Sequence, residues 1–153
     1  MLMTRSLLSE LSAAAAQSPR RRKNRNFHRL DSAPAHRLLN ALEPDSYVRP
    51  HRHLDAAKDE TMIVVRGRFG LLTFNQDGGV DSATLIEPGG EVIGVDIPHA
   101  TFHMILALAP GSIFFEAKAG PYVPLSAAET ASWAPAEGAS EACSYLVRMR
   151  KLF

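Results

Sequence analysis

The chain has little cysteine: Cys143 is the single one among its 153 residues. An internal disulfide is therefore impossible, and we expect a fold that does not need an oxidising compartment. No apolar run approaches the roughly 20 residues that a membrane-spanning helix requires. The short apolar stretch near the N-terminus is interrupted by Glu10, so we predict a cytoplasmic protein rather than a secreted one.

Net charge is also nearly absent, because 17 Lys and Arg residues face 16 Asp and Glu residues. No global field steers such a molecule toward nucleic acid or a membrane, so neither is an expected partner. The basic stretch 20–25 is short and has no interleaved aromatic residues, which argues against nucleic-acid binding. We expect it to be either a solvated strand or a strand that closes over a pocket. In the second case one face would present Arg22, Asn24, Asn26 and His28.

Tight turns are abundant, with ten glycines and ten prolines. From Tyr47 onward, short apolar runs alternate with turn residues such as Asp77-Gly78-Gly79. Such short strands, roughly seven or eight in number, favour an antiparallel sandwich or barrel, which is an all-β fold. The expected strands include residues 61–66, 69–74, 80–87, 91–97, 103–108 and 112–118.

Leucine spacing predicts helices outside this β region. One covers roughly the first 15 residues and closes before Pro19. A second short helix is expected to start at Ser32 and to end before Pro44. A third is expected from about Glu141 to the C-terminus.

Three histidines and a glutamate carry the clearest chemical signal in the sequence. His51 and His53 alternate along the chain, so in a strand they point to the same side. Glu60 follows after a spacer of six residues, and His103 ends a second cluster that begins at Gly94. Imidazole is the commonest metal ligand in proteins, and a carboxylate adds an anionic oxygen. Such a set holds a divalent ion and leaves positions open for water or substrate.

These motifs, His-x-His, Glu, six residues and Gly67, then Pro-x-Ala-x-x-His, resemble the paired motifs of the cupin superfamily. The resemblance implies a double-stranded β-helix, or jelly roll, with short N- and C-terminal helices. It also implies one divalent ion (Zn, Fe, Mn or Ni), with the ligands His51, His53, Glu60 and His103. The spacer before Glu60 is longer than in most cupins, and Asp45 and Ala100 stand where cupins commonly have glycine at turns.

Over about residues 20–146 the chain resembles the WbuC-type cupin-fold metalloproteins. The shared features include residues 38–44 and 47–53, Arg66-Gly67-Arg68, Gly120-Pro121-Tyr122 and Trp133-Ala134-Pro135. That family is encountered with bacterial O-antigen and surface-polysaccharide genes. We expect a single domain, divided into an N-terminal helix (1–19), a cupin β-barrel with a preceding strand and short helix (20–123), and a C-terminal extension (124–153).

Several other residues are candidate substrate contacts. Tyr47 and Arg49 share the parity of His51 and His53, so in a regular strand they would line the same interior. The arginine fork suits an anionic group on a substrate. Glu116, Lys118 and Tyr122 lie at or after the last strand, where cupin pockets often receive polar contacts. Glu60, as a free base, and Tyr122 are catalytic candidates, whereas His28, His36 and His99 are expected at the surface.

The leading hypothesis is a metal-dependent enzyme, such as an isomerase or dioxygenase, that acts on a small carbohydrate or sugar-nucleotide metabolite. An alternative is a non-catalytic, metal-dependent module that binds or senses a small, anionic or sugar-like ligand. A third is a metal-free sugar epimerase, which the intact histidine and glutamate positions disfavour. A homodimer is expected, because the open edges of a jelly roll need covering.

Overall fold

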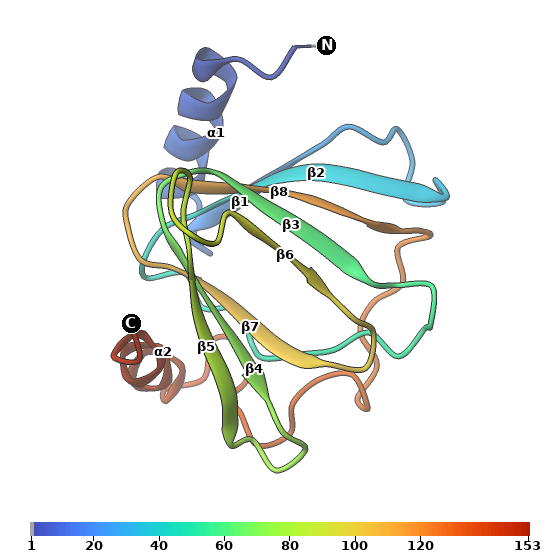
Figure 1. The fold of residues 1–153 in the computed structure, drawn as a ribbon, viewed down its shortest axis with the longest axis vertical. Helices are drawn as coiled ribbons and strands as arrows, with labels where there is room; N and C mark the ends of the chain where they lie inside the picture. Colours follow the sequence, from blue (N-terminus) through green and yellow to red (C-terminus); the bar gives the residue numbers. More distant parts are fainter. Residues whose placement is uncertain (1) are drawn as a thin grey trace.

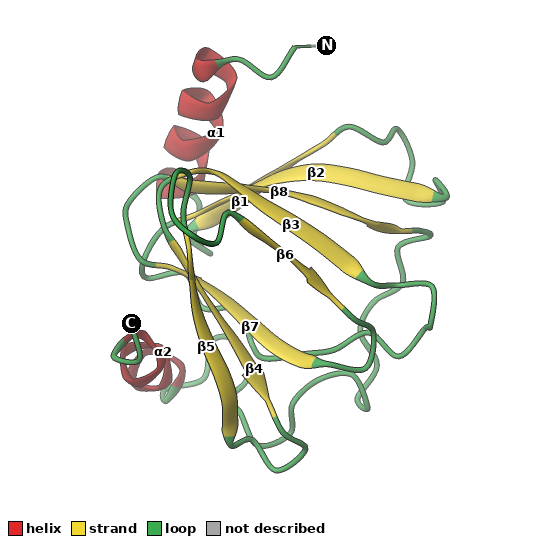
Figure 2. Cartoon of the chain, in the orientation of Figure 1, coloured by secondary structure: helices red, strands yellow, loops and turns green. Residues whose placement is uncertain are grey.

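The computed structural model describes residues 2–153, which form two short helices and eight strands (Figure 1). The order along this described range is α1 (Arg5–Gln17), β1 (Arg22–Asn26), β2 (Ala35–Leu42), β3 (Glu60–Arg66), β4 (Phe69–Phe74), β5 (Val80–Ile86), β6 (Gly94–Ile97), β7 (Phe102–Ala107), β8 (Ser112–Ala119) and α2 (Ala142–Arg150). Thus an all-β body lies between two terminal helices (Figure 2), as the sequence predicted.

The strands form two antiparallel sheets. One has five strands in the order β1-β2-β8-β3-β6, and the other has three in the order β5-β4-β7. Apolar side chains on the facing surfaces form a core that includes Met62 and Val64 of the larger sheet and Leu71 of the smaller one. The rings of Phe69 and Phe114 meet edge to face across this core, with centroids 5.2 Å apart. The predicted jelly-roll sandwich is therefore confirmed.

Helix α1 covers the outer face of the larger sheet at β2 and β8 (Figure 1). The helix begins where the Thr4 hydroxyl accepts a hydrogen bond from the Leu7 amide at 3.2 Å. Its buried residues Leu11 and Ala15 pack with Leu39 and Ile113 of the sheet. The outer face of this part of the sheet is thereby closed to solvent.

Residues 35–42 form strand β2, so the predicted helix from Ser32 to Pro44 is wrong. The strand pairs with β1 on one side and with β8 on the other. Leu39 faces α1, whereas Leu42 belongs to the core between the sheets. Because apolar side chains are needed on both faces of β2, its leucines do not alternate strictly with polar residues. Their spacing therefore imitates that of a helix.

Helix α2 covers the outer face of the smaller sheet, and its start after Glu141 agrees with the prediction. Its residues Tyr145 and Leu146 pack in one cluster with Leu72 of β4 and Met104 of β7. Among the described residues, neither helix has the length and apolar character needed to cross a membrane.

Candidate metal centre

The predicted metal ligands converge at one end of the sandwich. Glu60 is the first residue of β3, and His103 is the second residue of β7. His51 lies in the segment between β2 and β3 and exchanges two backbone hydrogen bonds with His103, of 3.0 and 2.9 Å. His53 follows two residues later, so both sheets and one connection contribute to the cluster.

The donor atoms of this cluster lie close enough to share an ion. His51, His53 and Glu60 each offer one ligand atom, and these atoms all lie within 4.8 Å of one another. His53 Nε2 is 3.1 Å from Glu60 Oε1, and His103 Nε2 is 3.1 Å from Glu60 Oε2. The side chains of Glu60 and His103 are only 3% and 2% exposed. A carboxylate this deeply buried requires a positive partner.

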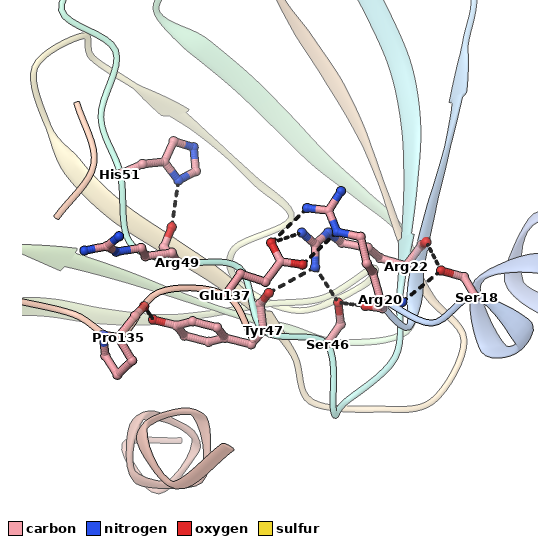
Figure 3. A network of polar contacts seen from close by, with 9 residues as sticks. All are labelled: Ser18, Arg20, Arg22, Ser46, Tyr47, Arg49, His51, Pro135 and Glu137. Atoms are coloured by element: carbon pink, nitrogen blue, oxygen red, sulfur yellow. Dashed lines mark hydrogen bonds and ion pairs between the residues drawn. The ribbon is translucent and has the colours of Figure 1, made fainter. Parts of the chain in front are cut away.

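Backbone carbonyls orient two of the imidazole rings. His51 Nδ1 is 3.0 Å from the Arg49 carbonyl oxygen (Figure 3), and His103 Nδ1 is 3.0 Å from the Thr101 carbonyl oxygen. Because a carbonyl oxygen can only accept, Nδ1 of each ring carries the proton and donates it. In the neutral imidazole the lone pair is then on Nε2, which is a common arrangement in metal sites.

Three buried atoms of the cluster have no hydrogen-bond partner within the described chain: His53 Nε2, Glu60 Oε2 and His103 Nε2. A nitrogen lone pair that faces a carboxylate oxygen is repelled by it unless a cation lies between them. Unpaired buried polar atoms cost free energy, and a shared ion would satisfy all three. The donor set, which consists of imidazole nitrogens and one carboxylate, therefore fits a divalent metal.

The protonation states agree with this arrangement. Burial, together with the neighbouring His103, lowers the pKa of His51 to about 3, so its ring is neutral at pH 7. Burial alone would raise the pKa of Glu60. Hydrogen bonds from His103 and His53, which their Nε2 atoms donate only when protonated, and the charge of Lys118 outweigh burial and hold that pKa below its usual range. Neutral imidazole and ionised carboxylate are the ligand forms that metals need.

Lys118 of β8 links the cluster to a second buried acid. Its ammonium donates to Glu60 Oε1 at 2.6 Å and lies 2.8 Å from Glu116 Oε1. Asn40 Nδ2 donates to Glu116 Oε2 at 2.7 Å. Burial raises the pKa of Glu116, whereas the charges of Glu116 and Glu60 outweigh burial at Lys118 and raise the pKa of its ammonium. Glu116 thus points inward, and Phe115 faces outward toward α1.

A cavity of about 170 Å³ opens next to the histidines. Tyr122, which is 60% exposed, lies at the rim of this cavity, and the cavity is also lined by His51 and His53 of the cluster. The residues around this cavity are His36, His51, His53, Lys58, Lys118, Ala119, Pro121, Tyr122, Val123 and Leu125. A small molecule that entered it would therefore meet His51, His53 and Lys118.

Tyr47 and Arg49 are placed elsewhere, and this corrects the expectation that they line the same interior as the histidines. The Tyr47 hydroxyl donates to the Pro135 carbonyl at 2.8 Å (Figure 3), and Arg49 Nε donates to the Ala131 carbonyl at 3.0 Å. Residues 46–50 are not in a strand, so the alternation argument does not apply to them. Both side chains instead fasten the C-terminal segment to the sandwich.

His28 and His36 were expected at the surface, but they are 9% and 4% exposed. Their rings stack at 3.9 Å between centroids. For His36 the prediction is wrong because the leucine spacing predicts a helix over residues 32–43, which hides the alternation that turns His36 and Asn40 to the inner face of β2. His99 is at the surface, as expected, where its Nδ1 lies 2.9 Å from Asp59 Oδ1.

Comparison with known proteins gives one family assignment. The model of a domain of unknown function, DUF6016, matches residues 3–86, which is more than half of the chain. The chain belongs to the DUF6016 family. A search of curated proteins found no significant match.

Solved structures resemble this DUF6016 protein in fold. KdgF from Halomonas sp. is 19% identical with a TM-score of 0.53, over 70% of this chain and 85% of that chain. Oxalate decarboxylase from Bacillus subtilis is 17% identical with a TM-score of 0.50, over 67% of this chain and 25% of the decarboxylase. A cupin-2 domain protein from Shewanella frigidimarina is 17% identical with a TM-score of 0.49, over 64% of this chain and 80% of that one. The chain therefore shares the jelly-roll fold of KdgF and oxalate decarboxylase, and a divalent metal fits its histidine and glutamate cluster.

Proposed function

We propose that this DUF6016 protein is a metal-dependent enzyme that acts on a small carbohydrate or sugar-nucleotide metabolite. The observation that carries the proposal is the set of unpartnered nitrogen and oxygen donors that face one another beside an open cavity. In this proposal the ion is held by His51, His53, Glu60 and His103. When bound, it supplies Lewis-acid polarisation of a substrate oxygen.

The residues around the cavity would bind and orient the substrate. Lys118 extends from β8 toward Glu60, so its ammonium would lie beside an oxygen of a ligand at the cluster. The exposed Tyr122 hydroxyl at the rim can donate or accept a hydrogen bond. Glu60 is occupied by contacts with His53, His103 and Lys118, which favours a ligand role over that of a free general base.

The second candidate function is a non-catalytic, metal-dependent module that binds a small ligand. One feature of the cavity favours it: Lys118 is held between two carboxylates, and Glu60 Oε1 already contacts both Lys118 and His53. A site without an available base can bind a ligand without converting it. A metal-free epimerase has less support, because it gives no role to the unpartnered donors.

Three finer expectations belong to the same proposal: the surface-polysaccharide context that the WbuC resemblance implies, a cytoplasmic location and a homodimer. Ile63 and Val65 on the outer face of β3 are 43% and 38% exposed, and a second copy of the chain would cover such apolar residues. Sedimentation equilibrium of the full chain measures this, and a monomer at all concentrations would remove the dimer from the proposal.

Product analysis tests the enzyme proposal. The full chain, loaded separately with Zn²⁺, Fe²⁺, Mn²⁺ or Ni²⁺, is incubated with a panel of sugars, sugar acids and sugar nucleotides, and products are followed by NMR. We expect conversion of one substrate class that stops after chelation of the metal and in His53→Ala. The His99→Ala variant is the control, because His99 is an exposed histidine outside the cluster. Binding of panel members without conversion under any metal supports the binding module instead.

A further inference from the structure

The inner face of the larger sheet continues beyond the part that the smaller sheet covers. Even-numbered residues of β2 and β8 point inward: Leu42 and Phe114 lie in the core between the sheets. The same face of β1 and the first part of β2 lies outside that core and borders a groove of about 510 Å³. The groove is lined mainly by polar residues: Arg20, Arg22, Asn24, Asn26, His28, Asp31, His36, Leu38, Asn40, Glu116, Lys118 and Tyr122.

Strand register connects this groove to the candidate metal centre. His36 pairs with Lys118, and Lys118 pairs with Glu60, so the three residues form one row across β2, β8 and β3. His36, Lys118 and Tyr122 line both the groove and the small cavity beside the histidines. The groove and the small cavity are therefore adjacent on one face of the sheet, so a ligand that reached the cluster would lie next to the groove.

The groove has room for a second part of a ligand whose first part lies in the cavity at the cluster. Asn40 is four residues beyond His36 on β2, which is about 13 Å along an antiparallel strand. Asn24 of β1 pairs with Asn40, so the far end of the groove carries two amide side chains side by side. The volume of the groove, about 510 Å³, is also larger than the 170 Å³ of the cavity at the cluster.

The arginine and lysine side chains along the groove are already paired with carboxylates. Arg20 and Arg22 each contact Glu137 at 2.7 Å (Figure 3), and Lys118 lies between Glu60 and Glu116. A phosphate or carboxylate would have to displace a carboxylate from these cations. Asn40 and Asn24 already donate one hydrogen bond each, to Glu116 and Asn26. An amide has a second N–H and an acceptor oxygen, which together match the hydroxyl groups of a sugar. The chemistry of the groove thus favours an uncharged ligand rich in hydroxyl groups.

We propose that the groove formed by β1, β2 and β8 is a subsite for an uncharged, polyhydroxylated moiety, such as a second sugar ring, attached to the part of the substrate that reaches the metal centre. This inference rests on the proposed function and makes it narrower. The substrate is then an oligosaccharide or glycoside rather than a single sugar or a nucleoside diphosphate sugar. Asn24 and Asn26, whose side chains are exposed on β1, are specificity-determining residues of this subsite.

Calorimetric titration of the Zn²⁺-loaded full chain tests the subsite. The probes are neutral mono-, di- and trisaccharides of glucose, galactose, mannose and rhamnose, with UDP-glucose and GDP-mannose as charged competitors. We expect the affinity for at least one series to rise tenfold or more from monosaccharide to disaccharide. The double variant Asn24→Leu, Asn26→Leu should abolish this rise and leave both the monosaccharide affinity and the zinc content unchanged. Lys23→Leu is the matched control, because Lys23 lies on the same exposed strand but does not line the groove.

The subsite proposal would be overturned if mono- and disaccharides bound with equal affinity in every series, or if none of them bound. Tighter binding of the sugar nucleotides that weakens steeply with salt and is lost in Arg20→Ala would also overturn it, because the ligand would then be anionic. Repeating the series with His53→Ala separates the two proposals. If affinity still rises from monosaccharide to disaccharide in this metal-free variant, the groove is supported even if the metal-dependent function fails. If the protein binds zinc but its affinity does not rise with the length of the saccharide, only the metal centre is supported.

Discussion

On β3 the inward side chains Met62 and Val64 pack against the smaller sheet, whereas on β1 and β2 the same inner face carries Asn24 and Asn40. The difference follows from the number of strands in each sheet. Three strands face five, so the inner face of β1 and β2 extends past the covering sheet. Burial against the smaller sheet contributes stability on one side, while the uncovered side is free to carry polar groups.

The candidate metal centre lies at the boundary between these two parts. Glu60 pairs with the buried Ile97 on one side and with Lys118 on the other. At this position a carboxylate is desolvated by the core and yet contacts His53 and Lys118, which line the small cavity. A functional group placed there gains strong electrostatic interactions with side chains that a ligand can reach.

The largest effect is expected from a pair of substitutions in one row of the larger sheet. Met62 and Leu38 both pair with Glu116 from opposite sides. Met62→Ala creates a cavity in the core and should lower the free energy of unfolding by about 2–5 kcal/mol. Leu38→Ala, on the half-buried groove side, should cost less than about 1 kcal/mol. Urea unfolding measures both, and similar losses for the two variants would contradict the division of the inner face.

Replacement of Lys118 by methionine should change stability and metal affinity in opposite directions. Without its ammonium, Glu60 and Glu116 lose a shared positive partner, so the free energy of unfolding of the metal-free protein should fall by about 3 kcal/mol. The metal should bind more tightly, because an ammonium 2.6 Å from a ligand oxygen competes with the ion for Glu60. Thermal unfolding with and without chelator, together with zinc titration, measures both effects. Weaker zinc binding in Lys118→Met would show that the lysine does not compete.

Ala100 lies in the turn that leads to His103 and has a φ of +62°, in the left-handed region. Its amide donates to the His53 carbonyl at 2.6 Å, so the turn is tied to the cluster. Because glycine adopts this conformation freely, Ala100→Gly should raise the free energy of unfolding by about 1 kcal/mol. Chemical denaturation measures the change. A destabilised variant with unchanged metal content would mean that the alanine methyl group makes a favourable contact.

The smallest expected effect concerns Glu137, which holds Arg20 and Arg22 at the groove. Contacts with both arginines lower the pKa of Glu137 to about 2, chiefly through the hydrogen bond from Arg20. This carboxylate therefore stabilises the fold at neutral pH, and its contribution is lost as the pH falls toward 2. Since the pair is partly exposed and screened, Glu137→Gln should cost less than about 1 kcal/mol at pH 7.

The measurement is the free energy of unfolding of the wild-type protein and of Glu137→Gln across pH 2–7. The difference between the two free energies should shrink from about pH 4.5 downward. A difference that stayed constant across this range would assign the effect of Glu137→Gln to packing rather than to charge.

Most strands were predictable because their faces differ. In β3 buried and exposed residues alternate, with Met62 and Val64 inside and Ile63 and Val65 outside. Strand β2 was not predictable in this way, since α1 covers one of its faces and the sandwich core covers part of the other. A local sequence pattern cannot show that a helix will bury one face of a strand and the core between the sheets will bury the other.

The candidate site was predictable where residue type alone restricts the chemistry. His51, His53, Glu60 and His103 are groups with few roles other than ligation when they recur in such motifs, and the structure brings them together. The parity argument for Arg49 failed because it assumed a regular strand across Pro50, where the chain is irregular. Asn40 could be found only from the pairing of β2 with β1 and β8, which depends on contacts between residues distant in sequence.

The central claim is tested most directly by the metal content of the untagged full chain, measured by inductively coupled plasma mass spectrometry and followed by zinc titration. We expect close to one divalent ion per chain, with affinity reduced at least about tenfold in His53→Ala and Glu60→Gln, since even the outer partners of a metal site contribute that much. The His99→Ala control should retain full binding. Metal content far below one per chain that is the same in all four proteins would contradict the account.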